Sequence, residues 1–254
     1  MLTKIVEKKK HEVARLELPQ LRNVPKYSFY EALMSPKRSL GVIAEMKKAS
    51  PSKGVLKENF SPIDIGADYE KAGVDCISVL TDQSFFKGST LDLITVKELT
   101  QVPVLRKDFI IDRLQIEESV RIGADAILLI AEILTDDKLL LFYNEATDKG
   151  LDVLVEVHSL ERLFQLLQTL SPKIIGVNNR NLQTFETNIK TTKQLAEHIP
   201  DNSLLVSESG ILTHEDLKEV AEYGANAVLV GEAFMKDISP GVGVKRLFGE
   251  LEHV

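Results

Sequence analysis

The chain has 254 residues and a formal net charge of -7, and 44% of its residues are hydrophobic. This is an ordinary globular composition, and the acidic balance argues against a nucleic-acid binder, which would show a basic patch or stripe. A membrane span is excluded, because the longest apolar candidate, AILLIAEIL, is interrupted by Glu132 and falls short of about eighteen residues.

Residues 1–18 begin the chain with apolar side chains at near-helical spacing and charges between them. The segment lacks the apolar core of a signal peptide, and Glu7, Glu12 and Glu17 disfavour a transit peptide. We interpret it as a structural helix of a cytoplasmic protein. Cys76, the only cysteine, lies in an apolar run, so we expect a buried, inert thiol and neither a disulfide framework nor a cysteine-rich metal site.

Eight short apolar runs recur along the chain, and most of the gaps between them contain an amphipathic helix pattern. Continuous apolar runs suit strands that are buried on both faces, as in parallel sheets. We expect strands at residues 40–44, 76–80, 102–105, 126–130, 151–155, 173–177, 203–206 and 226–230. The clearest helix patterns are PIDIGADYEKAG, RLQIEESVRIG, LTDDKLLLFYNEATDKG, LERLFQLLQTL and HEDLKEVAEYG.

Several joints share a glycine that ends a helix, then Asp or Asn, then a strand. These glycines are Gly73, Gly123, Gly150 and Gly224. Their separations are near multiples of about 25 residues, as in the repeating βα units of a barrel. We therefore predict an α/β fold, a single (βα)8 TIM barrel over residues 1–254, with an N-terminal helical extension, residues 1–38, covering the mouth of the active site. An open doubly wound sheet is the alternative, weakened because no Gly-x-Gly-x-x-Gly follows the first strand.

Polar side chains follow nearly every predicted strand, at the ends where such barrels carry their chemistry. The opposite ends begin with glycine, proline, serine, or Asp and Asn caps. Glu45 and Lys47 share one strand face, because residues two apart on a strand point the same way. Similar groups follow other strands, among them Lys107, Glu156, Asn178, Arg180 and Ser209. This asymmetry between the two ends indicates an enzyme.

Each of these groups also has a structural interpretation that the sequence leaves open. Glu45 and Lys47 fit a solvated strand end, and Lys107 lies in RKD, which is typical of a surface charge run. Glu156 lies in an apolar context, where an unpaired carboxylate is costly, and fits a buried ion pair. The five histidines have no ligand spacing and are interpreted as surface residues. GVGV at 241–244 resembles a phosphate loop only weakly.

The segments SESGI and VGEAFM end the seventh and eighth predicted strands. Phosphates in these barrels often bind backbone N–H groups of the loops after strands 7 and 8, together with a short extra helix. Small residues in both segments allow a close approach, and EAFMK can form the short helix. The sequence therefore predicts a substrate that carries a phosphate.

Six motifs on six different strands together closely resemble the indole-3-glycerol-phosphate synthase family of tryptophan biosynthesis. They are IAEMKKASPSKG, VLRKDFI, LVEVH, IGVNNRNLQTF, VSESGI and VLVGEAFM. The resemblance runs from about residue 1 to 250 and includes the segment before the first strand. It implies ring closure of 1-(2-carboxyphenylamino)-1-deoxyribulose 5-phosphate to indole-3-glycerol phosphate, CO2 and water. It also implies that no metal or other cofactor takes part and that the protein is a monomer, with a weak homodimer as the alternative.

The resemblance also implies site residues. The catalytic set is Glu45, Lys47, Lys107, Glu156, Asn178, Arg180 and Ser209. The phosphate-binding set is Ser50, Ser209, Gly210, Gly231 and Glu232, the last through its backbone N–H rather than its side chain. Candidates for the aryl pocket are Phe86, Phe109, Leu128 and Leu182.

Two rival functions stay open at this point. One is another phosphosugar barrel enzyme, such as a phosphoribosylanthranilate isomerase or a Schiff-base aldolase that uses Lys107. Borohydride would trap such an aldolase with its substrate, whereas a synthase would not be trapped. The other is a non-catalytic phosphate-binding barrel, which would have no need for three charged groups directed at one cavity.

Overall fold

Eight parallel strands close into a barrel in the computed structural model of the protein, which describes residues 2–51, 53–181, 184 and 186–251. The barrel strands are β1 (Gly41–Met46), β4 (Cys76–Leu80), β5 (Val104–Lys107), β6 (Ala126–Ile130), β7 (Asp152–Val157), β8 (Ile174–Asn178), β9 (Leu204–Glu208) and β10 (Ala227–Val230). Their order is β1-β10-β9-β8-β7-β6-β5-β4, and β1 closes the ring by pairing with both β10 and β4. The predicted barrel is confirmed.

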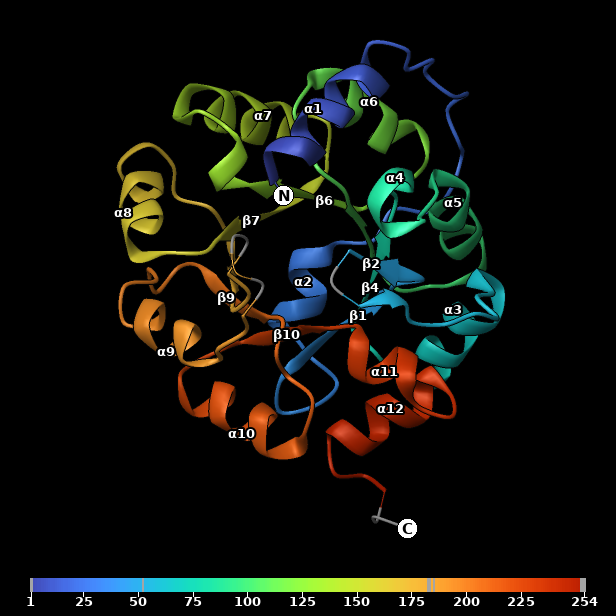
Figure 1. The fold of residues 1–254 in the computed structure, drawn as a ribbon, viewed down its shortest axis with the longest axis vertical. Coiled ribbons are helices and arrows are strands. Elements are labelled where there is room, and N and C mark those ends of the chain that lie inside the picture. Colours follow the sequence, from blue (N-terminus) through green and yellow to red (C-terminus); the bar gives the residue numbers. More distant parts are fainter. Residues whose placement is uncertain (1, 52, 182–183, 185, 252–254) are drawn as a thin grey trace.

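A ring of helices surrounds the barrel (Figure 1). The longer helices after the strands are α3 (Pro62–Lys71), α5 (Thr90–Leu99), α6 (Arg113–Arg121), α7 (Asp136–Asp148), α8 (Leu160–Thr169), α9 (Lys190–Ala196), α10 (His214–Glu222) and α12 (Pro240–Leu247). Shorter elements are the hairpin β2 (Ala49–Ser50) and β3 (Gly54–Val55), α4 (Gln83–Phe86), the 3-10 helix η1 (Ala131–Ile133) and α11 (Glu232–Lys236). Two helices precede β1, α1 (Leu2–Val13) and α2 (Phe29–Met34). No helix within the described residues is long and apolar enough to cross a membrane.

Local chemistry sets both ends of the helices. The side chains of Ser61, Asp112 and Thr213 accept hydrogen bonds from backbone N–H groups in the first turns of α3, α6 and α10. The four joint glycines that were expected to end helices all have positive φ. A larger residue at Gly123 is unfavourable for two reasons. Its φ of 86° strains any residue with a Cβ atom, and that atom would lie 2.6 Å from Val24 Cγ2.

Side-chain alternation along the strands places a layer of charged groups inside the barrel, next to its apolar interior. On β1, Ile43 belongs to the apolar cluster that fills the barrel interior, whereas its neighbours on the strand pack against the helices. Because side chains two apart share a face, the next inward residue of β1 is Glu45. The same alternation leads to Lys107 on β5, Glu156 on β7 and Glu208 on β9. A charged layer therefore lies directly above an apolar layer.

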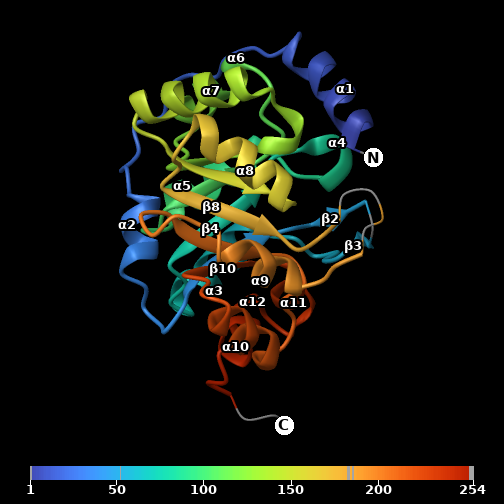
Figure 2. The same ribbon diagram turned by 90° about the vertical axis from the view of Figure 1, so that its left-hand side faces the viewer.

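The two helices before β1 lie at opposite ends of the barrel (Figure 2). α1 lies at the C-terminal ends of the strands, where Leu2 and Ile5 line a cavity. α2 covers the N-terminal ends, and Phe29 and Leu33 pack into the apolar interior. The extension over residues 1–38, expected at the mouth, is thus divided: α2 closes the bottom of the barrel because its apolar side chains fill the open end of the core.

A buried ion cluster fastens α1 to the barrel. Lys9 Nζ lies 2.8 Å from the carboxylate of Glu12 and 2.9 Å from the carboxylates of Asp82 and Asp108. Burial alone would raise the pKa of Asp108, but Arg106 and Lys9 lower it to about 2. The helix is therefore held against the end of β5 by charge pairs that are shielded from water.

The GVGV segment lies inside α12, so its weak resemblance to a phosphate loop is misleading. Gly241 N donates to Asp68 Oδ2 at 2.7 Å, and a Cβ atom on Gly241 would lie 2.7 Å from Asp68 Oδ1. The glycine permits close packing of α12 on α3.

Candidate active site

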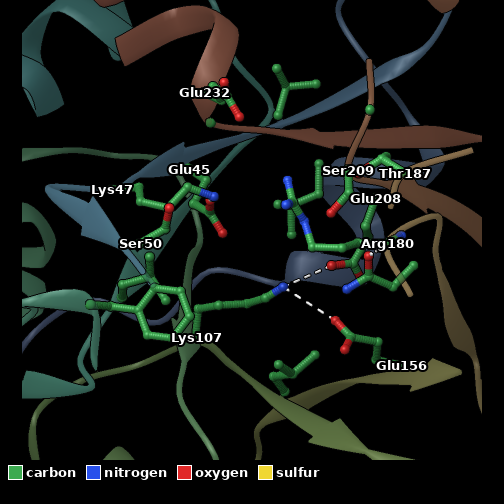
Figure 3. Close-up of a pocket in the computed structure, with 18 of the residues that line it drawn as sticks. Glu45, Lys47, Ser50, Lys107, Glu156, Arg180, Thr187, Glu208, Ser209 and Glu232 are labelled. Carbon is green, nitrogen blue, oxygen red and sulfur yellow. Dashed lines mark hydrogen bonds and ion pairs between the residues drawn. The ribbon is translucent and has the colours of Figure 1, made fainter. Parts of the chain in front are cut away.

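A cavity of about 350 Å³ opens at the C-terminal ends of the barrel strands. Its volume lies within the range of small-molecule sites, roughly 300–1,000 Å³. Inward side chains of the charged layer and the loops that follow the strands surround it (Figure 3). It brings together all of the predicted catalytic and phosphate-binding residues: Glu45, Lys47, Ser50, Lys107, Glu156, Asn178, Arg180, Ser209, Gly210, Gly231 and Glu232.

The Lys107 ammonium on β5 lies between two carboxylates (Figure 3). Its Nζ is 2.7 Å from Glu208 Oε2 and 3.3 Å from Glu156 Oε2. Burial alone would lower the pKa of Lys107, but the charges of Glu208, Glu156 and Glu45 outweigh burial and raise it well above its ordinary value. Lys107 is only 9% exposed, so a surface charge run does not describe this segment. The side chain is a fixed ammonium at the cavity wall.

Glu45 and Lys47 form an ion pair at the end of β1. Burial alone would raise the pKa of Glu45, but the ammonium groups of Lys47 and Lys107 lower it, so the carboxylate stays ionised. Tyr69 Oη donates to the main-chain oxygen of Glu45 at 3.1 Å and fixes this part of the strand. Because Glu45 is 4% exposed, the interpretation as a solvated strand end is wrong.

Glu208 is a member of the charged layer that the sequence prediction did not select. Burial raises its pKa to about 7, because the Lys107 ammonium only partly offsets burial and the Glu156 charge adds to it. A Cβ atom on Gly176 of β8 would clash with Glu208 Oε1, so the glycine leaves the space that this carboxylate occupies. The strand alternation Leu204, Val206, Glu208 is the signal that identifies it, since the first two face the barrel interior.

His158 contradicts the interpretation of all five histidines as surface residues. Its Nε2 lies 2.9 Å from Glu156 Oε1, and its Nδ1 lies 3.1 Å from the main-chain oxygen of Arg180. Its main-chain N–H donates to Glu132 Oε1 at 2.7 Å. The spacing Glu-x-His at the end of β7 was the available signal, because it directs both side chains to the same face.

Asn178 and Arg180 reach the cavity from the end of β8. Asn178 Oδ1 accepts a hydrogen bond of 3.0 Å from Arg180 N, which folds the chain back at the strand end. Arg180 then pairs with Thr187 in an isolated antiparallel bridge, and Thr187 also lines the cavity. The two predicted residues therefore occupy one rim of the site, with Thr187 as an unanticipated neighbour.

The loop after β9 has a left-handed backbone conformation that residues other than glycine rarely adopt. Ser209 and Gly210 have φ of 67° and 81°, in the left-handed region. Asn179 Nδ2 donates to the main-chain oxygen of Ser209 at 3.0 Å and holds the turn. A Cβ atom on Gly210 would lie 2.5 Å from Thr187 Cγ2, so this position requires glycine.

Gly231 follows β10 and Glu232 begins α11, next to the loop after β9 because β10 pairs with β9. A Cβ atom on Gly231 would lie 2.6 Å from Glu45 Oε2, so Gly231 also makes room for a residue of the charged layer. The Glu232 carboxylate lies 2.6 Å from Lys236 Nζ and 3.5 Å from Lys53 Nζ. Its carboxylate is thus paired with two lysines.

Apolar side chains line the part of the cavity near α4. Phe86 and Phe109 have ring centroids 6.0 Å apart at an interplanar angle of 35°. Leu128 and Ile130 of β6 line the same cavity. Three of the four candidates for an aryl pocket therefore lie together, and Leu182 falls outside the described residues.

Comparison with known proteins identifies the family. The chain matches the family model described as indole-3-glycerol phosphate synthase over residues 2–247. The chain belongs to the indole-3-glycerol phosphate synthase family. The indole-3-glycerol phosphate synthase of Priestia megaterium is 55% identical over 253 residues, covering 100% of this chain and 99% of that protein. That of Halalkalibacterium halodurans is 52% identical over 249 residues, covering 98% and 97%.

The indole-3-glycerol phosphate synthase of Bacillus pumilus is 53% identical over 250 residues, covering 98% of this chain and 100% of that protein. Solved structures with a similar fold include 3-hexulose-6-phosphate synthase from Salmonella typhimurium, with a TM-score of 0.66, 15% identity and coverage of 82% of this chain and 96% of that one. Thiamine phosphate pyrophosphorylase from Pyrococcus furiosus gives a TM-score of 0.60, 15% identity and coverage of 83% and 95%. At such identities the likeness concerns the fold alone.

Proposed function

We propose that the protein converts 1-(2-carboxyphenylamino)-1-deoxyribulose 5-phosphate into indole-3-glycerol phosphate, CO2 and water, as a decarboxylating lyase of tryptophan biosynthesis. The observation that carries this proposal is the buried Lys107 ammonium, held by two carboxylates at the mouth of a barrel of this family. The same cavity offers two glycine-containing loops on its rim and an apolar part near α4. These three features match the ketone, the phosphate and the aryl group of the substrate.

Ring closure needs a proton donor at the ketone. The ring carbon that bears the carboxylate attacks the C2 ketone of the sugar, and the ketone oxygen gains negative charge as the new bond forms. Lys107 donates a proton to this oxygen. Glu208 Oε2, at 2.7 Å, and Glu156 Oε2, at 3.3 Å, keep the ammonium in place before the substrate arrives, so little reorganisation is needed in the transition state.

Loss of CO2 uses the substrate itself. The carboxylate leaves from a carbon β to the iminium that forms at the ring nitrogen, and this iminium accepts the electron pair. Because the substrate is its own electron sink, the proposed reaction requires neither a metal nor an organic cofactor.

Dehydration then needs one base and one acid. We assign the base to Glu156, which takes a proton from the carbon next to the ring nitrogen, and the acid to Lys47, which protonates the leaving hydroxyl. Both residues line the cavity, from β7 and from the end of β1. The ion pair with Glu45 orients the Lys47 ammonium.

Substrate binding is assigned to the rim. Ser209 and Gly210 on one loop, Gly231 and the Glu232 backbone on the other, and Ser50 from β2 would hold the phosphate, because small residues allow close approach to backbone N–H groups. Asn178 and Arg180 would position the sugar hydroxyls and the intermediate. Phe86, Phe109 and Leu128 would enclose the aryl group.

We further propose that the chain acts as a single-domain monomer in the cytoplasm, with α1 covering the site. Support for one domain comes from α1 and α2, which pack on the two ends of one barrel. The charged layer is complete within one chain, so the proposed chemistry needs no residue from a second subunit.

Incubating the purified protein with the carboxyphenylamino substrate and following indole fluorescence tests the proposal. We expect fluorescence to rise with release of one CO2 for each indole formed. Absence of turnover, or covalent trapping of substrate on Lys107 by borohydride, would contradict it and favour a binding protein or a Schiff-base aldolase, respectively.

A further inference from the structure

His158 holds the carboxylate that we assign as the base. The ring lies just beyond β7, with Nε2 2.9 Å from Glu156 Oε1 and Nδ1 3.1 Å from the main-chain oxygen of Arg180. The other carboxylate oxygen, Glu156 Oε2, lies 3.3 Å from Lys107 Nζ. Each oxygen of the carboxylate therefore has a different basic partner, which fixes the plane of the group.

The two partners of the His158 ring determine its charge. A main-chain oxygen only accepts hydrogen bonds, so the contact with Arg180 requires a proton on Nδ1. A carboxylate oxygen also only accepts, so a neutral ring with its proton on Nδ1 would turn a lone pair on Nε2 toward Glu156. Protonation of both nitrogens removes this conflict. The geometry is therefore that of an imidazolium beside a carboxylate.

The surrounding charges support the imidazolium. Burial alone would lower the pKa of His158, but the hydrogen bond and charge of Glu156, together with the charge of Glu132 on η1, raise it to about 9. Behind Glu156 lie Lys107 from β5 and Glu208 from β9. Burial alone would raise the pKa of Glu156, but Lys107 and His158 lower it below its ordinary value.

We propose that His158 is a positioning residue for Glu156 in the reaction proposed above, and that its imidazolium keeps the carboxylate ionised and correctly oriented. Lys107 cannot do this alone, because it must give up its proton during ring closure and for that interval stops balancing the Glu156 charge. The imidazolium remains charged at that moment and preserves the base for dehydration.

The pH profile of kcat/KM tests this role in His158→Gln and His158→Asn. Removing the imidazolium raises the pKa of Glu156, so the acid limb of the profile should move to higher pH by about 1–3 units. Glutamine keeps a neutral N–H donor, so His158→Gln should retain more of the plateau kcat than His158→Asn while showing the same shift. KM for the substrate should stay within about twofold, because the proposed role acts on a catalytic step rather than on binding. His198→Asn, at an exposed histidine, is the matched control and should keep the parental profile.

A second measurement separates this inference from the proposed function. The raised pKa means that the His158 contribution to the free energy of unfolding is complete below about pH 6.5 and is lost as the pH rises through about 9. Urea titrations should show this loss in the parent and not in His158→Gln. Identical profiles for the two proteins, in stability or in kcat/KM, would overturn the inference. A stability difference in a protein without turnover would contradict the proposed function and leave the ion pair in place.

Discussion

Replacing Gly176 by alanine tests whether the Glu208 carboxylate must occupy its present position. An added Cβ would clash with Glu208 Oε1 and would lie 3.3 Å from both Glu208 Cδ and Leu154 Cδ1. Leu154 fills the apolar layer below, so the carboxylate has to move rather than the strand. Moving Glu208 also moves the Lys107 ammonium that it holds. A misplacement of about 1 Å at an active site costs roughly 100-fold in rate, so we expect kcat to fall by about that factor. Overpacking should also lower the free energy of unfolding by about 1–3 kcal/mol.

Initial rates from indole fluorescence and urea titrations measure the two effects. Gly41→Ala is the matched control, since a Cβ there would lie 3.0 Å from Ala227 Cβ at the other end of the barrel, and it should lose stability while keeping kcat. Adding Glu208→Asp to Gly176→Ala should restore part of the loss, because the side chain is one methylene shorter and withdraws from the new methyl group. A Gly176→Ala protein with parental kcat would refute the reasoning.

Three further predictions concern the surroundings of the site. Lys9→Met removes the cation that Asp82 and Asp108 share, and among the described residues Asp108 keeps only its ion pair with Arg106. The free energy of unfolding in urea should therefore fall by about 3–5 kcal/mol, and an unchanged value would show that the cluster does not hold α1. Glu232→Gln removes a negative charge from the cavity rim and frees Lys53 from its ion pair. The Ki of inorganic phosphate should therefore fall about threefold, whereas a rise in Ki would mean that the carboxylate assists phosphate binding. The pKa of Asp108 is lowered from 3.8 to about 2, so its contribution of about 2 kcal/mol is present above pH 3.8 and lost as the pH falls through about 2; urea titrations of Asp108→Asn should lack that acid-induced loss.

The barrel was predictable because its strands are buried on both faces. Apolar runs identify all eight strands within a few residues, and the predicted strands mostly stop short of the polar residues that the structure includes, as at Glu45 and Glu208. Helices with one apolar stripe are equally predictable, because their apolar residues recur at helical spacing. α5 has no such stripe, because Lys97 is buried and pairs with Asp125 at 2.6 Å on the face that apolar residues would otherwise fill. α2 and the hairpin β2–β3 are too short for periodicity to show.

The candidate site was predictable only in part from the residues themselves. The family motifs identify Lys107 and Glu156. Strand alternation by itself also predicts that both side chains face the barrel interior. The SESGI motif draws attention to phosphate binding by Ser209 and Gly210, whereas Glu208 is identified as inward-facing only by its alternation with Leu204 and Val206. Metal-ligand spacing does not distinguish His158 from the other histidines, because its ring partners are a carboxylate two residues earlier and a main-chain oxygen. Its charge depends on a main-chain oxygen of Arg180, a partner that no sequence pattern displays.

Steady-state turnover of Lys107→Ala tests the central claim most directly. A positioned acid contributes roughly 10²–10⁴-fold, or about 3–5 kcal/mol, so kcat should fall by that factor because the proton moves only as the ketone becomes an alcohol. The fold should persist, since Glu208, whose pKa is already raised, takes up a proton when the neighbouring ammonium is removed. Binding of indole-3-glycerol phosphate, measured by its fluorescence, should remain, and Lys218→Ala at an exposed lysine of α10 should match the parent. Full turnover in Lys107→Ala would contradict the account and leave the proposed ring closure without its acid.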